Sequence, residues 1–296
     1  MKLLLIYNAF SGHGRARRIL PEIQKIFLHK GIDLDVKLTK YPKNATEIAR
    51  ETDFAEYDGL VAGGGDGTLF EVINGYFRNK SSRRIPLGVL PVGTGNAFAR
   101  DLDLDNTRWL EAIDIIAGNK PRKVDVGLFK TERDDYYFIN ILGLGFVSDV
   151  TNTALSLKIF GNVSYLLGVF YQTIFLKTHI LHIEIDGQML ERNNIFVEIS
   201  NTRYTSNFLM APSAQFDDGF LDVTLLGKIS RTKLLRTLPT VFTGEHVHVK
   251  EVETFKAKHI RIATSIPKTL TPDGEVLEQT PIDVTCLHHA IEVFGR

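Results

Sequence analysis

The chain has 296 residues, 44% of them hydrophobic and 24% charged, so its composition is that of a globular protein with a full buried core. Its 35 Lys and Arg residues balance 35 Asp and Glu residues, which argues against general nucleic-acid binding, and its one cysteine, Cys286, excludes a disulfide framework and a cysteine-based zinc site. No run reaches the roughly 18–20 apolar residues of a membrane-spanning helix, so we expect a cytoplasmic protein that is at most peripheral to a membrane.

The first 120 residues alternate strand and helix patterns. Apolar runs predict strands at 2–7, 34–39, 59–62 and 85–90. Helical spacing of apolar residues predicts helices at 15–30, 45–51, 68–78 and 106–117. This alternation predicts a parallel sheet covered on both faces, with ligands at the carboxyl ends of its strands.

After about residue 123 the pattern changes to a series of strands with few helices. Strands are expected at 136–141, 180–185, 195–200, 221–226, 247–255, 260–263, 282–287 and 291–294. Several of them alternate polar and apolar residues, which indicates an antiparallel sheet with one wet or ligand-facing side. We therefore predict an α/β N-terminal domain with a parallel sheet over residues 1–122, followed by a mainly antiparallel β domain over residues 123–287.

Three glycine-rich turns follow predicted strands of the first domain, at 8–14, 63–68 and 93–96. The second reads Gly-Gly-Gly-Asp-Gly-Thr, and a helix starting at Thr68 would direct its free N–H groups towards an anion. Because several such turns at one sheet edge offer backbone donors together, phosphate is the expected anion. Asp66 is then placed to act on that phosphate through a metal. The sequence lacks both the P-loop and the kinase-type glycine pattern. The basic cluster near the start of the first predicted helix comprises Arg15, Arg17 and Arg18. It is interpreted as a solvated helix face, and the alternative is that its charge steers ATP or anionic lipid towards the protein.

Two acidic turns occur in the second domain. Pro272-Asp273-Gly274-Glu275 reads by itself as a plain hairpin, because Asp-Gly is a common turn pair. The segment 215–222 either binds Mg²⁺ or Ca²⁺ or forms a solvated loop. His246 and His248 have the spacing of one strand face, but no acidic or cysteine partner completes a zinc site.

Four motifs in order make the chain similar to a known family. They are Gly-Gly-Asp-Gly-Thr at 64–68, Gly-Thr-Gly-Asn at 93–96, Asp-Asp-Gly at 217–219 and Asp-Gly-Glu at 273–275. This set resembles the soluble bacterial lipid kinases of the diacylglycerol kinase catalytic-domain family, which also includes sphingosine and ceramide kinases. The first motif alone also occurs in NAD kinases and phosphofructokinases, and the two later motifs favour the lipid kinases. The resemblance runs from the first strand to the last.

The resemblance implies a nucleotide cleft between the two domains, the lipid on the β-domain side, and residues 288–296 packed back on the first domain. It implies that ATP is bound by Asn8, Ser11, Thr39, Gly64, Gly65, Asp66, Gly67, Thr68, Thr94 and Glu275. Asp66 would organise the catalytic Mg²⁺ and the phosphates with Glu275 close by, and Asp273 would be the general base. In a structural Mg²⁺ site, Asp218 would supply a side chain, and Gln215 and Phe220 their carbonyls.

The function expected from the resemblance is an ATP- and Mg²⁺-dependent lipid kinase that acts at the membrane surface, with diacylglycerol as the first substrate guess. Three alternatives stay open: a kinase for another lipid alcohol, either a sphingoid base or a phosphatidylglycerol-like lipid, a non-catalytic nucleotide- or lipid-binding regulator, and, more distantly, an NAD kinase. A homodimer is compatible with each. Residues 150–183 carry aromatic and basic but no acidic side chains, so they form either a buried helix on the sheet or a groove that admits lipid from an anionic bilayer.

Overall fold

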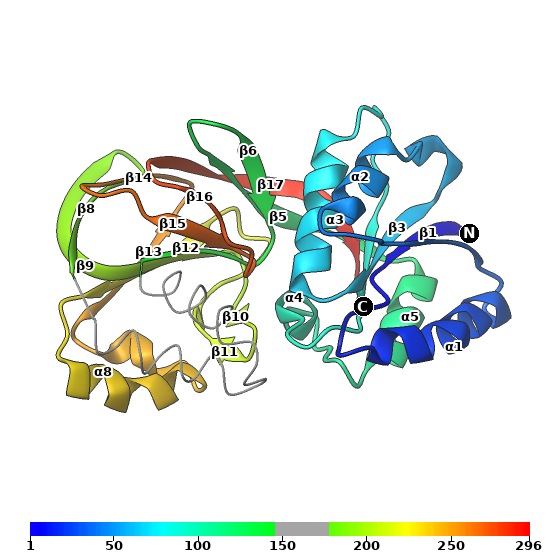
Figure 1. Cartoon of the computed structure of the whole chain (residues 1–296), viewed down its shortest axis with the longest axis horizontal. Helices are drawn as coiled ribbons and strands as arrows, with labels where there is room; N and C mark the ends of the chain where they lie inside the picture. Colours follow the sequence, from blue (N-terminus) through cyan, green and yellow to red (C-terminus); the bar gives the residue numbers. More distant parts are fainter. Residues whose placement is uncertain (146–177) are drawn as a thin grey trace. The chain divides into compact units, whose positions relative to one another are not determined.

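The computed structural model describes residues 1–145 and 178–296 and divides into two compact units (Figure 1). The first consists of Met1–Val126 with His288–Arg296, and the second of Gly127–Leu287. The chain passes between them within two strands, β5 (Pro121–Lys130) and β17 (Ile282–Phe294). Within the described ranges, no helix is long and apolar enough to cross a membrane. Most of the 150–183 segment, with both of its predicted roles, lies outside the described residues.

A parallel sheet forms the centre of the first unit. Its strand order is β2 (Asp33–Leu38), β1 (Lys2–Tyr7), β3 (Gly59–Gly64), β4 (Leu87–Pro91), and the end of β17 continues the parallel pairing on β4. Leu5 in the middle of β1 pairs with Val36 on one side and Val61 on the other. Strands β1, β3 and β4 are apolar and buried almost throughout, as expected for strands covered on both faces.

Helices cover both faces of this sheet. Helix α1 (Arg15–His29) packs against α5 (Trp109–Gly118), and α2 (Asn44–Glu51) packs against α3 (Asp66–Arg78). Figure 1 shows the two pairs on opposite sides of the strands. Two predictions for this unit need correction. Helix α3 begins at Asp66 rather than Thr68, because Gly65 alone connects it to β3, and a short helix α4 (Ala97–Asp101) follows the third glycine-rich turn.

The second unit is an antiparallel β sandwich. Its main strands are β7 (Ile141–Gly145), β8 (His179–Ile185), β9 (Gln188–Ser200), β12 (Leu221–Gly227), β13 (Val252–Ala257), β14 (His259–Thr264), β15 (Thr269–Pro272) and β16 (Leu277–Gln279). The long strand β9 is paired with β7, β8 and β12. Smaller elements are β6 (Asp135–Phe138), which pairs with β5, the hairpin β10 (Tyr204–Thr205) and β11 (Phe208–Leu209), and helix α8 (Arg231–Thr237).

Strand alternation explains the core of the second unit. Side chains at every second position of β9 and β12, such as Val197, Ile199 and Val223, enter one apolar cluster that also contains Phe129 and Phe138. Because the side-chain period of a strand is two, the positions between them point to the other face.

Three strand predictions for this unit were wrong in detail. The expected strand 136–141 is two strands, β6 and β7, separated by Ile139 and Asn140. Strand β13 begins only at Val252, and His246 and His248 lie in a 3₁₀ helix (Glu245–His248), so they do not share a strand face. The predicted strands 282–287 and 291–294 are one strand, because His289 takes a left-handed backbone conformation (φ 53°) without ending the pairing.

Glu198 is a buried carboxyl group on β9 whose burial raises its pKa from 4.5 to about 7, although Thr205 and Ser200 donate hydrogen bonds to it. The folded state therefore holds this proton more tightly than the unfolded chain, so its contribution to stability is complete below pH 4.5 and is lost as the pH rises through 7. Between pH 4 and pH 8, we expect the free energy of unfolding in urea to fall by about 3 kcal/mol more for the wild type than for Glu198→Gln. If the free energies of unfolding of the two proteins change with pH in parallel, the raised pKa of Glu198 is contradicted.

Candidate active site

The three glycine-rich turns meet at one edge of the parallel sheet, as their positions after β1, β3 and β4 predict. The N–H of Asn8 donates a hydrogen bond to the carbonyl oxygen of Gly63 (2.8 Å), and the N–H of Thr39, just after β2, donates one to the carbonyl oxygen of Tyr7 (2.9 Å). These bonds hold the first two turns and the end of β2 side by side.

Neutral hydrogen-bonding side chains lie on the first two turns. The Asn8 amide donates to Thr68 Oγ1 (3.3 Å), and its carbonyl oxygen accepts from the N–H of Phe10 (3.0 Å). Ser11 follows in the same loop, and its N–H donates to the backbone carbonyl oxygen of Asn8 (3.1 Å), not to the side-chain oxygen that Phe10 uses. The structure thus places Asn8, Ser11 and Thr68 on two adjoining turns, and such neutral groups suit a polyphosphate. Their role in binding ATP stays a prediction.

The second and third turns touch through their backbones. A Cβ atom on Gly93 would lie 2.3 Å from the Cα of Gly65 and 2.7 Å from its nitrogen, so no side chain fits there. A Cβ on Gly12 would lie 2.6 Å from the carbonyl oxygen of Val92, which ties the first turn to the third. Thr94 is exposed beyond this contact. Glycine is therefore needed where these turns approach one another, and this close approach builds a backbone cradle.

Asp66 stands at the first position of α3, beside this cradle. Its Oδ1 accepts a hydrogen bond from the N–H of Ala97 (2.6 Å), which fixes the carboxyl group. Burial raises the pKa of Asp66 to about 6, while hydrogen bonds from the backbone N–H groups of Ala97, Asn96 and Asp66 itself, and the charge of Arg100, partly offset this shift. The group is ionised above that pH, and a fixed carboxylate is a ligand that Mg²⁺ prefers.

The sequence pattern favours a solvated helix face for Arg15, with steering of ATP or lipid as the alternative, whereas the structure places Arg15 at the candidate site. Its Nη2 donates to the carbonyl oxygen of Gly93 (3.4 Å), its Nε is buried without a partner, and that Nε is 3.6 Å from where a Cβ of Gly12 would be. A guanidinium held against two phosphate-type turns favours an anion. The available signal was its position: a cation is disfavoured in the first turn of a helix, and α1 begins at Arg15.

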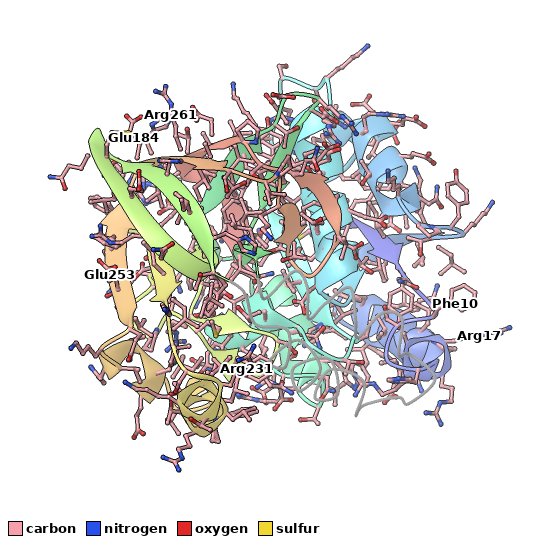
Figure 2. All side chains as sticks on the ribbon, turned by 60° about the vertical axis from the view of Figure 1, so that its left-hand side comes forward. Phe10, Arg17, Glu184, Arg231, Glu253 and Arg261 are labelled. Carbon is pink, nitrogen blue, oxygen red and sulfur yellow. The ribbon has the colours of Figure 1, made fainter. Side chains whose placement is uncertain are left out.

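We expect Arg15→Gln to raise the Kd for ATP by about 10- to 150-fold, because a charge-assisted hydrogen bond contributes about 1.5–3 kcal/mol. The matched control is Arg17→Gln, two residues away on the same helix. Figure 2 shows Arg17 on the outer surface of the first unit, as it does the exposed Phe10 of the first turn. Equal ATP affinities of the two variants in equilibrium titration would remove Arg15 from the site.

The late acidic turn in the second unit is the hairpin that its Asp-Gly pair predicts. Asp273 (φ 46°) and Gly274 (φ 86°) both have positive φ, and the N–H of Glu275 donates to the carbonyl oxygen of Pro272 (2.8 Å). This is the pattern of a type I′ turn, and it joins β15 to β16. The Glu275 side chain is exposed.

The Asp273 carboxylate is buried and held by three backbone donors. It accepts hydrogen bonds from the N–H groups of Ile139 (3.1 Å), Asn140 (3.0 Å) and Ile141 (2.9 Å). These donors lie where the predicted strand 136–141 is interrupted, so the turn explains the interruption. The backbone therefore fixes this carboxylate, which is a group that can act as a general base.

The acidic turn of the predicted metal ligands lies just before β12. Asp218 Oδ1 accepts from the N–H of Phe220 (3.0 Å), and its Oδ2 forms an ion pair with Lys256 (2.5 Å). Gln215 is exposed at the start of the same segment. One carboxylate and two carbonyl groups are oxygen donors of the kind that Mg²⁺ takes. However, the ammonium group of Lys256 already neutralises the Asp218 carboxylate. The three predicted ligands therefore do not fit a dication unless Lys256 is displaced. The metal role of Gln215, Asp218 and Phe220 stays a prediction.

The chain is similar to known proteins in sequence and in fold. Residues 2–129 match the family model described as diacylglycerol kinase catalytic domain, and residues 142–295 match the YegS C-terminal NAD kinase beta sandwich-like domain. The chain is 30% identical over 292 residues to a diacylglycerol kinase of Bacillus subtilis, which covers 98% of this chain and 94% of that protein. A diacylglycerol kinase of Staphylococcus carnosus has the same identity and coverage over 293 residues. A crystal structure described as a candidate diacylglycerol kinase from Bacillus anthracis has a TM-score of 0.79 at 28% identity, covering 100% of this chain and 97% of that one.

Proposed function

This chain belongs to the diacylglycerol kinase catalytic-domain family of lipid kinases, and from that membership we propose that it transfers the γ-phosphate of ATP to the free hydroxyl group of diacylglycerol, with Mg²⁺, to give phosphatidic acid. The observation that carries the nucleotide half of the proposal is the backbone contact of the glycine-rich turns beside Asp66. The named relatives support the choice of lipid.

The first unit binds the triphosphate in this proposal. Backbone N–H groups of residues 64–68, the uncapped start of α3 and the Arg15 guanidinium meet the phosphate oxygens, with Asn8, Ser11, Thr39 and Thr94 as neutral donors. Asp66 is the fixed carboxylate that would hold Mg²⁺, and this donor chemistry fits the ion. When bound, Mg²⁺ supplies positive charge to the phosphoryl oxygens during transfer. The exposed Glu275 would assist from the second unit.

Asp273 acts as the general base. A lipid hydroxyl is a poor nucleophile until its proton is accepted, and the Asp273 carboxylate takes that proton. The hydroxyl oxygen forms a bond to the γ-phosphorus while the bond from that phosphorus to the bridging oxygen breaks, and ADP leaves. Because the acceptor lipid resides in a bilayer, the protein works by peripheral contact with the membrane.

The test is a phosphorylation assay with γ-labelled ATP and mixed micelles, each containing one lipid: diacylglycerol, sphingosine, ceramide or phosphatidylglycerol, with NAD in a parallel reaction. We expect Mg²⁺-dependent label in phosphatidic acid. Label in another lipid would replace diacylglycerol as the substrate, and label in NAD would replace the lipid. A protein that binds ATP and labels none of these would be a regulator rather than a kinase for them.

A further inference from the structure

A carboxylate and two imidazoles form a cluster in the first unit, on residues that the kinase proposal does not use. Asp125 on β5 is fully buried, and His288 and His289 are exposed neighbours on β17. Nδ1 of His288 lies 2.9 Å from Oδ1 of Asp125, and the backbone N–H of His289 donates to the same oxygen (2.6 Å). The carboxylate is thus positioned by the backbone of the strand that carries both histidines.

The backbone of β17 is bent so that the two rings lie together. In a regular strand, successive side chains point to opposite faces. Here His289 has a φ of 53°, a left-handed conformation that residues other than glycine rarely adopt, and the two imidazole rings stack with centroids 3.6 Å apart and planes at 27°. A strained residue in mid-strand costs free energy, and its effect is to place two imidazoles beside one buried carboxylate.

The spacing of the donor atoms suits one ion. One ligand atom from each of Asp125, His288 and His289 lies within 4.8 Å of the others. Two ligands about 2.1 Å from a tetrahedral ion are about 3.4 Å apart. The distance between His288 Nδ1 and Asp125 Oδ1 is 2.9 Å, so a shift of about 0.5 Å in the exposed His288 side chain admits the ion. An ion can therefore take the place of the proton these two atoms share.

The donor types decide which ion fits. Imidazole suits Zn²⁺, Cu²⁺, Ni²⁺ and Fe²⁺, whereas Mg²⁺ requires oxygen ligands in octahedral geometry. Two histidines and one carboxylate supply three ligands, so a four-coordinate ion keeps at least one coordination position for water. Water can reach that position because the histidines are exposed. We propose that Asp125, His288 and His289 form a binding site for a divalent transition metal, represented by Zn²⁺, which ties β17 to β5. This site is independent of the proposed kinase reaction.

The test is calorimetric titration of the protein without a histidine tag, using Zn²⁺ in the presence of millimolar Mg²⁺. We expect one Zn²⁺ per chain at this site and a higher Tm with Zn²⁺ bound, since an ion that binds only the folded state stabilises it. His288→Gln and His289→Asn should each weaken this binding at least about tenfold, the loss typical of a damaged metal site. Asparagine is chosen at 289 because it tolerates the left-handed conformation.

His29→Gln is the matched control, because His29 is an exposed histidine of the same unit, on α1. Its Zn²⁺ affinity should equal that of the wild type. Circular dichroism and the metal-free Tm show whether each variant is folded. The proposal is overturned if the wild type binds no Zn²⁺, if folded His288→Gln and His289→Asn bind it as tightly as the control, or if Mg²⁺ displaces Zn²⁺ at comparable concentration.

Discussion

Asp273→Asn is expected to lower kcat for lipid phosphorylation by about 10²–10⁴-fold, the usual contribution of a general base, with the Kd for ATP unchanged. An amide cannot accept the hydroxyl proton. It also offers an NH₂ group where the wild-type carboxylate accepts three backbone N–H bonds, so Tm should fall as well. Single-turnover kinetics at saturating ATP and lipid measure the first effect, and thermal unfolding measures the second.

Thr271→Val separates the two roles of Asp273. Thr271 lies on β15, two residues before Asp273. It is buried, and its hydroxyl donates to the carbonyl oxygen of Gly143 (3.1 Å). Its loss should lower Tm but leave the Asp273 carboxylate intact. If Asp273→Asn and Thr271→Val reduce kcat equally at equal loss of stability, the carboxylate only holds the loop and the base lies elsewhere.

Asp66→Asn is expected to lower kcat at least about 10²–10³-fold, the loss typical of removing a group that stabilises developing charge, while raising the Tm of the protein without metal or nucleotide at pH 8. The stability gain follows from the raised pKa of Asp66: at pH 8 the folded state carries a partly desolvated charge that the unfolded chain solvates better. The amide oxygen can still accept the bond from the N–H of Ala97. Steady-state assays test the expected fall in kcat, and thermal unfolding tests the expected rise in Tm.

The control for Asp66 is Asp114→Asn, the same change at an exposed position of α5 whose ion pair with Lys30 is a surface contact of small energetic value. It should leave kcat and Tm nearly unchanged. A lower Tm for Asp66→Asn at pH 8 would show that its carboxylate is stabilising in the fold, contrary to the direction of its pKa shift.

Local pattern was sufficient for the fold class. The strands β1 and β3 and the helix α1 follow from apolar runs and helical periodicity, which are properties of short segments. The meeting of the glycine-rich turns also followed from the sequence, since parallel strands present their carboxyl ends at one edge. Helix α3 was placed two residues late because glycine disfavours a helix by intrinsic propensity, yet Gly67 lies in its first turn.

Other features depend on residues far apart in the chain. The turn at 272–275 was predicted from its Asp-Gly pair, but its side-chain contacts were not, because the Asp273 bonds to Ile139, Asn140 and Ile141 span 132 to 134 residues. The Arg15 bond to Gly93 spans 78 residues, and the position in the first turn of α1 that marks Arg15 applies equally to Arg17. His246 and His248 were placed on a strand because alternation over a few residues does not exclude a 3₁₀ turn.

The sequence by itself determined that this protein joins a parallel α/β unit to an antiparallel one and carries a phosphate-type turn with one carboxylate, Asp66. Periodicity and glycine spacing encode these features within a few residues. Only the tertiary structure decided how the charged side chains are held: Asp66 by the N–H of Ala97, Asp273 by a broken strand, and Asp125 beside His288 and His289. Their surroundings come from segments brought together by folding, so burial and hydrogen bonding set their chemistry.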